Sequence, residues 1–313
     1  MDTADRQPHG EAAAENPFAQ GAAFVEGQFV PVAEARIPLM DRGFTRSDAT
    51  YDVTHVWKGY IFRLDDYLDR FERNMAALRM APPLARDEIR AVLIECVRRS
   101  GLRDAYVQMT CTRGVPPGGS RDPRACTPRF YAFAVPFVWI SDPAQQKQGL
   151  NLHVSPRRRI PPDCLDPRIK NFHWLDMTLG QLEAFDAGCD TEVLTDGAGN
   201  LTEGPGFNLF VVRQGRLMTP AVGVFDGMTR RTVIELCQEL GLPVAETVVP
   251  VAGLATADEV FLSSTAGGIM PVTRIEGRVL GDGTPGPVTA RLQRIYWERK
   301  ANGWHGEPIV YSS

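Results

Sequence analysis

Apolar residues recur along the first half of the chain with two different spacings. Between Asp65 and Met80 they lie three or four positions apart, which predicts an amphipathic helix with Asp65 as its N-cap. A second helix is expected after the proline pair at 82–83, with Gly101 as its stop. Apolar runs also predict a β-hairpin at 22–32 and strands at 105–112 and 129–140.

The second half alternates strands and helices irregularly. The predicted strands lie near residues 152–155, 192–194, 207–212, 247–251 and 259–263. The predicted helices lie near residues 174–187, 229–240 and 287–300. The chain has neither internal repeats nor a regular βαβ rhythm, which favours an α+β fold over a doubly wound sheet. The two commonest glycine-rich nucleotide loops are absent from the sequence.

A length of 313 residues suggests two domains. The polar segment at 141–149 is the best linker candidate, because it separates two β regions. The sequence therefore predicts four parts, namely a mobile tail at 1–20, a smaller N-terminal domain at 21–142, a linker at 143–150 and a larger C-terminal domain at 151–313.

Charge and cysteine usage exclude several classes of protein. The net charge is −4 with both signs mixed along the chain, which argues against nucleic-acid binding. The longest apolar run, Tyr131–Ile140, is too short to span a bilayer, and the first residues do not read as a signal peptide, so a cytoplasmic location and no membrane partner are expected. The six cysteines and five histidines show no metal-ligand spacing, so we expect no metal site.

Lysine is scarce in this sequence, which shortens the search for an amine nucleophile. Lys170 is flanked by Ile169 and Phe172 just before a predicted helix. Apolar neighbours disfavour the charged form of an amine and lower its pKa toward the range in which it attacks carbonyls. A surface lysine before a helix is the alternative interpretation. The remaining lysines are expected to be solvated, namely Lys58, Lys147 and Lys300.

An acid and two anion sites accompany this lysine. Glu203 lies between a strand and a Gly-x-Gly turn, where it is either held rigidly or simply decorates a hairpin. Residues 226–229 open a helix, and residues 263–268 combine hydroxyls with glycines after a strand, so both could bind an anion. Arg70 could add a countercharge or form a helix-surface ion pair with Asp66. An amine, an acid and an anion site together are what pyridoxal phosphate requires.

The order of these segments resembles the fold-type-IV pyridoxal-phosphate enzymes. The resemblance rests on ARIPLMDRGF at 35–44, RLDDYLDR around Arg70, LTDGAGNLTEGPGFN around Glu203 and SSTAGGIMP from 263 onward, and it covers residues 24–275. This family includes branched-chain and D-amino-acid aminotransferases, aminodeoxychorismate lyases and (R)-selective amine transaminases.

The resemblance implies a two-domain α/β fold with pyridoxal 5′-phosphate between the domains and a homodimer that completes each site. Lys170 would form the Schiff base with the cofactor and transfer the proton, and Glu203 would bind the pyridine nitrogen. The other residues implied to bind the cofactor are Arg70, Phe207, Asn208, Met228, Thr229, Ser264, Thr265 and Ala266.

Two departures from the family pattern point to a subgroup. Tyr67 stands where the family has histidine, and SDATYD at 47–52 stands where it has GDGVFE. The segments SDATYDV, IKNFHW and TAGGIMP are similar to those of (R)-selective amine transaminases. The substrate residues implied are Tyr51, Val53 and His55 on one side, Tyr106, Trp174 and Ala266 on the other, and Arg121 for an acceptor carboxylate, with Arg124 in reserve.

The predicted function is a ping-pong transamination from a primary (R)-amine to an α-keto acid such as pyruvate. A D-amino-acid or branched-chain aminotransferase with the same machinery is the nearest alternative, and a lyase of the aminodeoxychorismate type is a weaker one. A non-catalytic binding protein of the same fold is the alternative from a different class.

Overall fold

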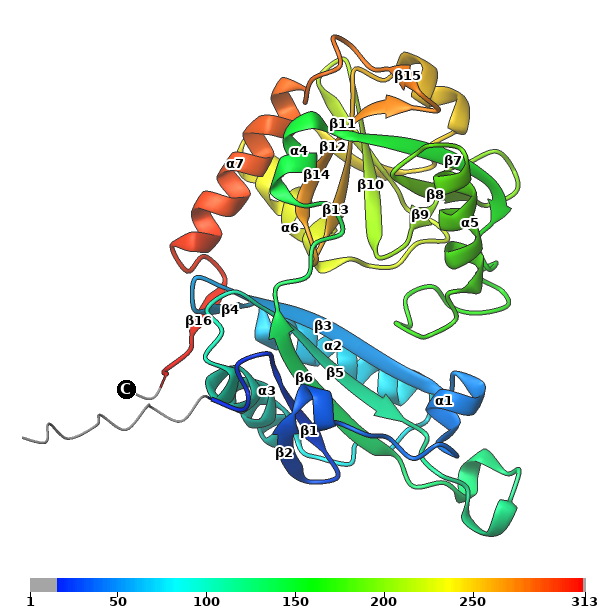
Figure 1. Cartoon of the computed structure of the whole chain (residues 1–313). Coiled ribbons are helices and arrows are strands. Elements are labelled where there is room, and N and C mark those ends of the chain that lie inside the picture. Colours follow the sequence, from blue (N-terminus) through cyan, green and yellow to red (C-terminus); the bar gives the residue numbers. More distant parts are fainter. Residues whose placement is uncertain (1–15, 312–313) are drawn as a thin grey trace, which may run out of the picture.

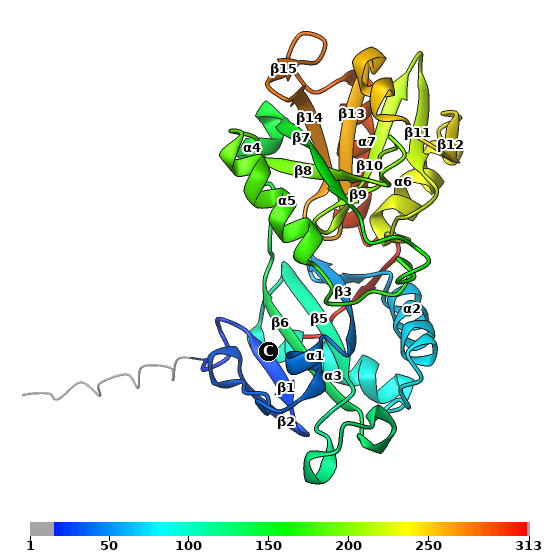
Figure 2. The same cartoon turned by 90° about the vertical axis from the view of Figure 1, so that its right-hand side faces the viewer.

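A computed structural model describes residues 16–311, so most of the predicted tail at 1–20 lies outside the described residues. Two β-sheets, each covered by helices, are stacked one above the other (Figure 1). The same two layers remain separate in the perpendicular view (Figure 2). An α+β fold with two lobes is therefore confirmed. Within the described residues no helix is both long and apolar enough to cross a membrane.

The first sheet has seven strands, and its neighbouring strands are all antiparallel. Their spatial order is β16 (Gly306–Pro308), β4 (Tyr60–Phe62), β3 (Ala49–Trp57), β5 (Ala105–Thr112), β6 (Arg129–Pro136), β1 (Ala22–Val25) and β2 (Gln28–Pro31). The helices α2 (Leu64–Ala77) and α3 (Arg86–Ser100) pack against this sheet, and the short helix α1 (Arg42–Arg46) precedes β3.

The second sheet contains nine strands with mixed directions. Its main path is β12 (Val244–Thr247), β11 (Arg216–Pro220), β10 (Phe207–Arg213), β13 (Glu259–Ser264), β14 (Gly268–Ile275), β7 (Leu150–Arg158) and β8 (Thr191–Thr195). The short strands β9 (Glu203–Gly204) and β15 (Arg278–Val279) pair with β10 and β14. Helix α5 (Leu175–Asp186) packs on β7 and β8, whereas α6 (Met228–Glu239) and α7 (Pro287–Ala301) pack on the central strands.

Several predicted elements shift or change type. Helix α2 begins at Leu64 rather than being capped by Asp65, which instead lies in the first turn, where its charge favours the helix dipole. The strand predicted at 247–251 is wrong, because β12 ends at Thr247 and a 3₁₀ turn begins at Val251. Two further 3₁₀ turns lie in the loop between β5 and β6, at Pro117–Gly119 and Pro123–Ala125. A last 3₁₀ turn spans Val32–Glu34.

The predicted linker at 143–150 contains helix α4 (Pro143–Gln148). The Asp142 carboxylate accepts hydrogen bonds from the backbone N–H groups of Ala144 and Gln145, and proline occupies the first helical turn. This capping explains why a polar, glutamine-rich segment is helical. The predicted division at residue 150 stays a prediction, and it omits one contact: β16, near the end of the chain, pairs with β4 of the first sheet.

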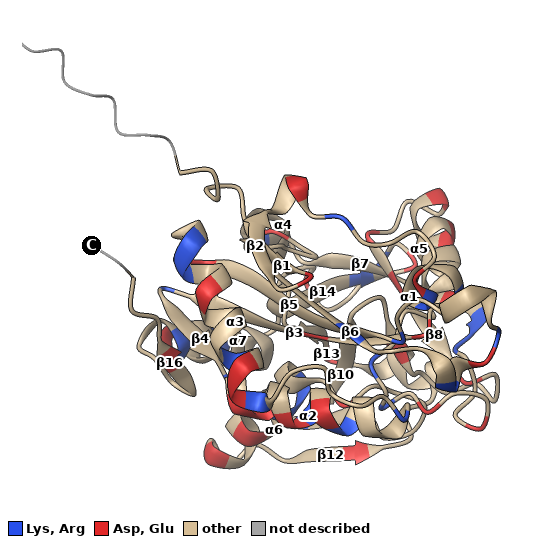
Figure 3. Ribbon diagram, turned by 90° about the horizontal axis from the view of Figure 1, so that it is seen from below, with Lys and Arg blue, Asp and Glu red and all other residues tan. Residues whose placement is uncertain are grey.

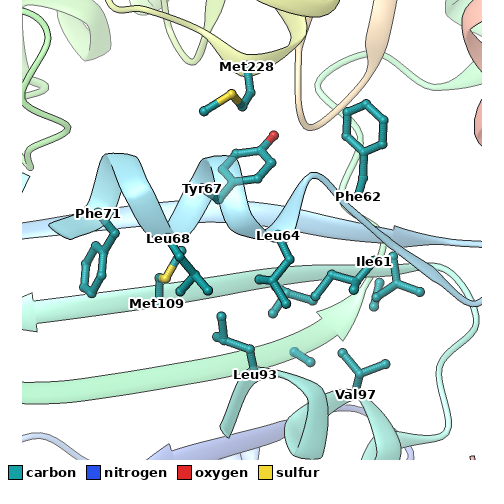
Figure 4. Close-up of a cluster of buried hydrophobic side chains, with 14 of the residues drawn as sticks. Ile61, Phe62, Leu64, Tyr67, Leu68, Phe71, Leu93, Val97, Met109 and Met228 are labelled. Carbon is teal, nitrogen blue, oxygen red and sulfur yellow. The ribbon is translucent and has the colours of Figure 1, made fainter. Parts of the chain in front are cut away.

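Buried apolar residues form two clusters. The larger one runs from the first sheet through α2 to α6 and α7, so it joins the two lobes. Figure 4 shows this junction, with Met228 of α6 above Tyr67 of α2. The second cluster lies between strands of the larger sheet and includes Leu152, Phe207 and Leu262.

Ion pairs also fasten α2 to α6. Asp66 of α2 contacts Arg63 at 2.9 Å and Arg231 of α6 at 3.0 Å. Arg231 also pairs with Glu235 at 3.0 Å, and Glu235 pairs with the buried Arg63. Seen from below, acidic and basic residues are interspersed along these helices (Figure 3). The network fixes the relative position of the two helices that carry Arg70 and Thr229.

Candidate active site

A cavity of about 270 Å³ lies between the two lobes. Its walls come from β3 and α2 of the smaller lobe, and from the 167–174 segment, the β9–β10 turn, the start of α6 and the β13–β14 turn of the larger one. Sites of this kind, between domains and lined by converging polar groups, are the usual place for a cofactor. The cavity therefore brings together segments that are far apart in the sequence.

Lys170 opens onto this cavity, and the smaller lobe holds its backbone. Its carbonyl oxygen accepts a hydrogen bond of 2.7 Å from the Thr50 hydroxyl and one of 3.3 Å from the Tyr51 N–H. Its amine lies 4.6 Å from the ring centres of both Tyr51 and Phe225. Burial lowers the pKa of Lys170 to about 8, reinforced by Arg70 and opposed by Asp52 and Glu203. These two rings thus provide the apolar surroundings that the sequence analysis expected from Ile169 and Phe172.

A second lysine corrects the expectation that Lys300 is solvated. Its side chain is buried at the end of α7, and its amine lies 4.1 Å from the ring centre of Trp297. Burial also lowers its pKa well below the ordinary value. Lys300 does not line the cavity, so a depressed pKa by itself does not single out a nucleophile. Access to the cavity distinguishes Lys170.

The pKa of Lys170 predicts how apoenzyme should recombine with pyridoxal phosphate. The uncharged amine is the nucleophile, so the recombination rate should rise about tenfold per pH unit up to pH 8 and then level off. Stopped-flow absorbance across this pH range measures the rate. Condensation of the same aldehyde with free N-acetyl-lysine gives the reference profile. An enzyme profile that follows free lysine toward pH 10.5 would contradict the assignment.

Glu203 is fixed by an arginine that the sequence did not single out. Its Oε1 accepts a hydrogen bond of 3.0 Å from Nε of the buried Arg159, and its Oε2 accepts one of 2.7 Å from the Phe225 N–H. Arg159 also pairs with Asp176 of α5 at 2.7 Å. Burial raises the pKa of Glu203, while Arg159 acts in the opposite direction. The carboxylate is therefore rigid and faces the cavity.

The start of α6 forms an anion-binding end of the cavity. Gly227 is the N-cap and offers no side-chain cap, so the first N–H groups of the helix have no intrahelical acceptor. A Cβ on Gly227 would clash with Oδ1 of Asn208, whose amide is held by the Phe225 carbonyl, so glycine is favoured here. The buried hydroxyls of Thr229 and Ser263 both line the cavity, and within the described residues that of Ser263 has no hydrogen-bond partner. These hydroxyls and the first N–H groups of α6 together fit a phosphate group.

Arg70 lines the same end but is already paired. Its Nε and Nη2 donate to Asp52 at 2.8 and 2.7 Å, and its Nη1 donates to the Asp226 carbonyl at 2.7 Å. The alternative ion pair with Asp66 is wrong, because Asp66 pairs with Arg63 and Arg231 instead. Arg70 is thus positioned by Asp52, a buried acid that the sequence interpretation overlooked.

Other residues predicted to bind the cofactor also line the cavity, and some have structural bonds. The Ser264 hydroxyl donates to the Gly206 carbonyl at 2.8 Å and accepts from the Ala266 N–H at 3.1 Å. The Asn208 amide donates to the Phe225 carbonyl at 2.9 Å and thereby shapes the turn before α6. The remaining predicted residues on the cavity wall are Phe207, Met228 and Thr265, the last bonded to the Tyr67 hydroxyl at 2.9 Å.

The predicted substrate residues divide into two groups. The cavity is lined by Tyr51, Val53, Tyr106, Trp174 and Ala266. The ring of Tyr51 stacks on that of Phe172, with the ring centres 4.6 Å apart. Their rings and methyl groups make this part of the wall largely apolar.

The structure does not place His55 and Arg121 in the cavity. His55 lies further along β3, where it is fully buried between Phe62 and Phe137. The strand continues beyond the cavity at this point, and the aromatic side chains of α7, called here the aromatic cover of α7, lie over it. Arg121 is exposed on the loop at the far edge of the smaller lobe.

Sequence patterns could have suggested some of the overlooked residues. Arg159 ends the run Arg157-Arg158-Arg159 and directly follows β7, so alternation continued past the end of the strand would have pointed some of these side chains inward. Asp52 lies in β3, where nearly all residues are buried. A carboxylate in such a strand needs a charged partner, and this need could have marked Asp52 as a functional candidate. Ser263 gave no separate signal, since it precedes the better-marked Ser264.

One cavity is surrounded by an amine, a rigid carboxylate and the anion-binding start of a helix. Together these three groups define a pyridoxal-phosphate-dependent enzyme. Comparison with known proteins identifies the family to which this enzyme belongs. The model of the amino-transferase class IV family matches residues 49–275, and the chain belongs to this family. The enzyme is thus a pyridoxal-phosphate-dependent aminotransferase of fold type IV.

Individual relatives agree with this assignment. A Methanocaldococcus jannaschii protein with a provisional branched-chain-amino-acid aminotransferase name is 34% identical over 87% of this chain and 94% of the relative. The D-alanine aminotransferase of Bacillus licheniformis is 30% identical over 85% of this chain and 93% of its own. The crystal structure of the branched-chain amino acid aminotransferase from Thermobaculum terrenum in its pyridoxal-phosphate form superposes with a TM-score of 0.84 at 30% identity, covering 95% of this chain and 99% of that one.

Proposed function

We propose that this aminotransferase moves the amino group of a hydrophobic primary (R)-amine to an α-keto acid such as pyruvate. The proposal rests on which of the cationic side chains in the cavity already have an ion-pair partner. Among the described residues lining the cavity, Arg70 is bonded to Asp52 and Arg159 to Glu203 and Asp176, which leaves Lys170 as the cation without an ion pair. An amine donor without a carboxylate needs no further cation, and the apolar wall suits its substituents.

The similarity of SDATYDV, IKNFHW and TAGGIMP to (R)-selective amine transaminases supports the same proposal. The two walls of the cavity differ: Tyr51 and Val53 on β3 and Tyr106 on the neighbouring β5 line one side, and Trp174 and Ala266 of the larger lobe line the other. Unequal walls allow one hand of a chiral amine to present its Cα–H bond to Lys170. A D-amino-acid or branched-chain aminotransferase remains the alternative, and the names of the relatives favour it.

The roles proposed for the chain's own groups follow from their positions. Bound pyridoxal phosphate supplies an aldehyde that takes the amino group and a ring that accepts electrons. Glu203 would hold the ring nitrogen, and the start of α6 with Thr229 would hold the phosphate, together with Arg70. The neutral amine of Lys170 would take the proton from the substrate Cα and pass it to the carbon of the cofactor's former aldehyde.

We also propose a homodimer. One face of α5 exposes Leu175, Leu179, Leu182 and Phe185, and the 77% exposure of Leu175 is unusual for a leucine. Leu39 and Met40, just before α1, are exposed as well. Helix α5 and the segment around α1 both lie at the right of Figure 1. A second copy of the chain would cover them and close the adjoining cavity.

The proposed dimer gives Arg121 a role. Its loop lies far from the cavity of its own chain, and within the described residues Arg121 has no ion-pair partner, whereas Arg124 is paired with Asp122 at 2.7 Å. Arg121 would reach the partner's cavity and bind the carboxylate of the keto acid. We further propose a cytoplasmic location, since all six cysteines lie in the described residues and are free thiols.

Single half-reactions test the donor. Holoenzyme mixed with one amine and no acceptor should lose its aldehyde-form absorbance, and (R)-1-phenylethylamine should react at least about tenfold faster than D-alanine or L-leucine. The (S)-enantiomer is the matched control and should be slower still. A faster reaction with D-alanine or L-leucine would replace the proposal by the corresponding amino-acid aminotransferase. An absence of spectral change with every amine would indicate a binding protein.

A further inference from the structure

Three groups able to bind a metal meet at the edge of the larger sheet, away from the cavity. They are His153 on β7, Cys189 between α5 and β8, and Glu276 after β14, and their ligand atoms all lie within 4.8 Å of one another. His153 Nδ1 is 3.0 Å from Glu276 Oε1. None of the three lines the cavity. Their spacing in the sequence matches no ligand motif, which explains why no metal site was predicted.

The sheet register brings the three together. Leu152 of β7 pairs with Ile275 of β14 on one side and with Thr191 of β8 on the other. His153 and Glu276 each follow one of these paired residues, and Cys189 lies two positions before Thr191. Since neighbouring strands lie about 5 Å apart, the register of β7 and β14 places His153 beside Glu276. The turn before β8 brings Cys189 to them, because the Asp190 N–H donates to the Asn151 carbonyl at 2.9 Å.

Backbone hydrogen bonds hold each ligand in place. The Glu276 N–H donates to the Leu152 carbonyl at 3.0 Å, and the Cys189 N–H donates to the Ala184 carbonyl at 2.8 Å. Glu276 Oε1 also accepts from the Val154 N–H at 2.6 Å, which orients its carboxylate toward β7. The positions of the three side chains thus depend on the sheet itself and do not require an ion.

The donor set selects a particular class of metal. One imidazole nitrogen, one thiolate and one carboxylate form a borderline-soft set that suits zinc better than calcium or magnesium. Cys189 is 6% exposed and the side chain of Glu276 is 47% exposed, so the site is closed on the thiol side and open to water on the other. Tetrahedral zinc places its ligand atoms roughly 3.3–3.8 Å apart, so each side chain must move by less than about 1 Å.

The charges of the donor set suit a divalent ion. A bound Cys189 thiolate and the Glu276 carboxylate would together balance a 2+ ion, and binding would release the thiol proton.

We propose that His153, Cys189 and Glu276 form a structural zinc-type site, with water as the fourth ligand, that fastens the α5–β8 connection and the β14–β15 turn to β7. The site is independent of the aminotransferase reaction. Its expected effect is on the stability of the larger lobe, since ions that bind the folded state raise its stability.

Titration of chelator-treated holoenzyme with Co²⁺ tests the site. One equivalent should give a thiolate-to-cobalt absorption band in the difference spectrum, and Zn²⁺ should displace it. The band should be lost in Cys189→Ser and kept in the control Cys164→Ser, whose thiol is exposed elsewhere. Zn²⁺ should raise the Tm of the parent enzyme but not of Glu276→Gln, a substitution at an exposed side chain.

Either of two results would overturn the site: absence of stoichiometric binding, or a band that persists in Cys189→Ser. If Cys189→Ser does not fold, Glu276→Gln decides, because an unchanged zinc-dependent Tm in that variant excludes the site. Half-reaction rates of Glu276→Gln should equal those of the parent. A loss of amine reactivity in the parent itself would concern the proposed function and not the metal.

Discussion

Replacing Lys170 with alanine should abolish transamination. The variant loses the amine that condenses with the cofactor aldehyde and the base that moves the Cα proton, and each contribution is large. We expect kcat to fall by at least about 10³-fold. Steady-state assays give kcat, and borohydride reduction followed by mass spectrometry shows whether the cofactor is covalently attached. The parent should be labelled at Lys170 and the variant should carry no label.

Two other lysines serve as controls for this experiment. Lys147 is exposed on α4 and should be replaceable by alanine without loss of rate. Lys300 shares the low pKa of Lys170 but is enclosed by Trp57, Trp297 and Tyr296. Borohydride should leave Lys300 unmodified, because it has no access to the cavity. Label on Lys300, or full activity in Lys170→Ala, would refute the assignment of the amine.

Glu203→Gln is expected to have the second-largest effect. Glutamine preserves the shape of the side chain but cannot hold a proton on the ring nitrogen as a carboxylate does, so the ring accepts electrons less well. It also leaves the buried guanidinium of Arg159 with a weaker partner. We expect kcat to fall roughly 10²–10⁴-fold while the cofactor stays bound through Lys170 and the start of α6.

Glu192→Gln is the matched control for this substitution. Glu192 is a fully buried carboxyl on β8, beside Gly180 of α5, and it does not line the cavity. Burial raises its pKa to about 7, so at neutral pH the amide replaces a carboxyl that is only partly charged. The control should retain most of its kcat. Equal losses in the two variants, measured together with their cofactor content, would mean that Glu203 acts through folding rather than on the ring.

Much of the fold could be predicted from local patterns. Helix α2 follows from the stripe formed by Leu64, Leu68, Phe71 and Met75, and the β1–β2 hairpin follows from its Glu26-Gly27 turn. Strand β3 could not be recognised in the same way. All but the last of its residues are buried, and they include Asp52, Thr54 and His55, so no alternation of polar and apolar residues marks it.

The chemistry of the site depends on residue types that the sequence displays openly. Lysine is scarce, Glu203 lies in a distinctive turn, and Thr229 lies two positions after a glycine at a helix start. The amine, the acid and the anion site could therefore each be named. The motifs around them also identified the family, which the family match to residues 49–275 confirms. The donor specificity stays a prediction.

By itself the sequence determined which groups are available and in what order, because turns, caps and helix starts depend on residues close together along the chain. Only the tertiary structure decided what those groups face. Packing between lobes enclosed Lys170 and Lys300 alike but opened a cavity to only one of them, and it moved His55 behind the aromatic cover of α7. Sheet register placed Arg159 against Glu203 and His153 beside Glu276. Contacts between residues 44 and 123 positions apart arise from the whole fold, and no local pattern specifies them.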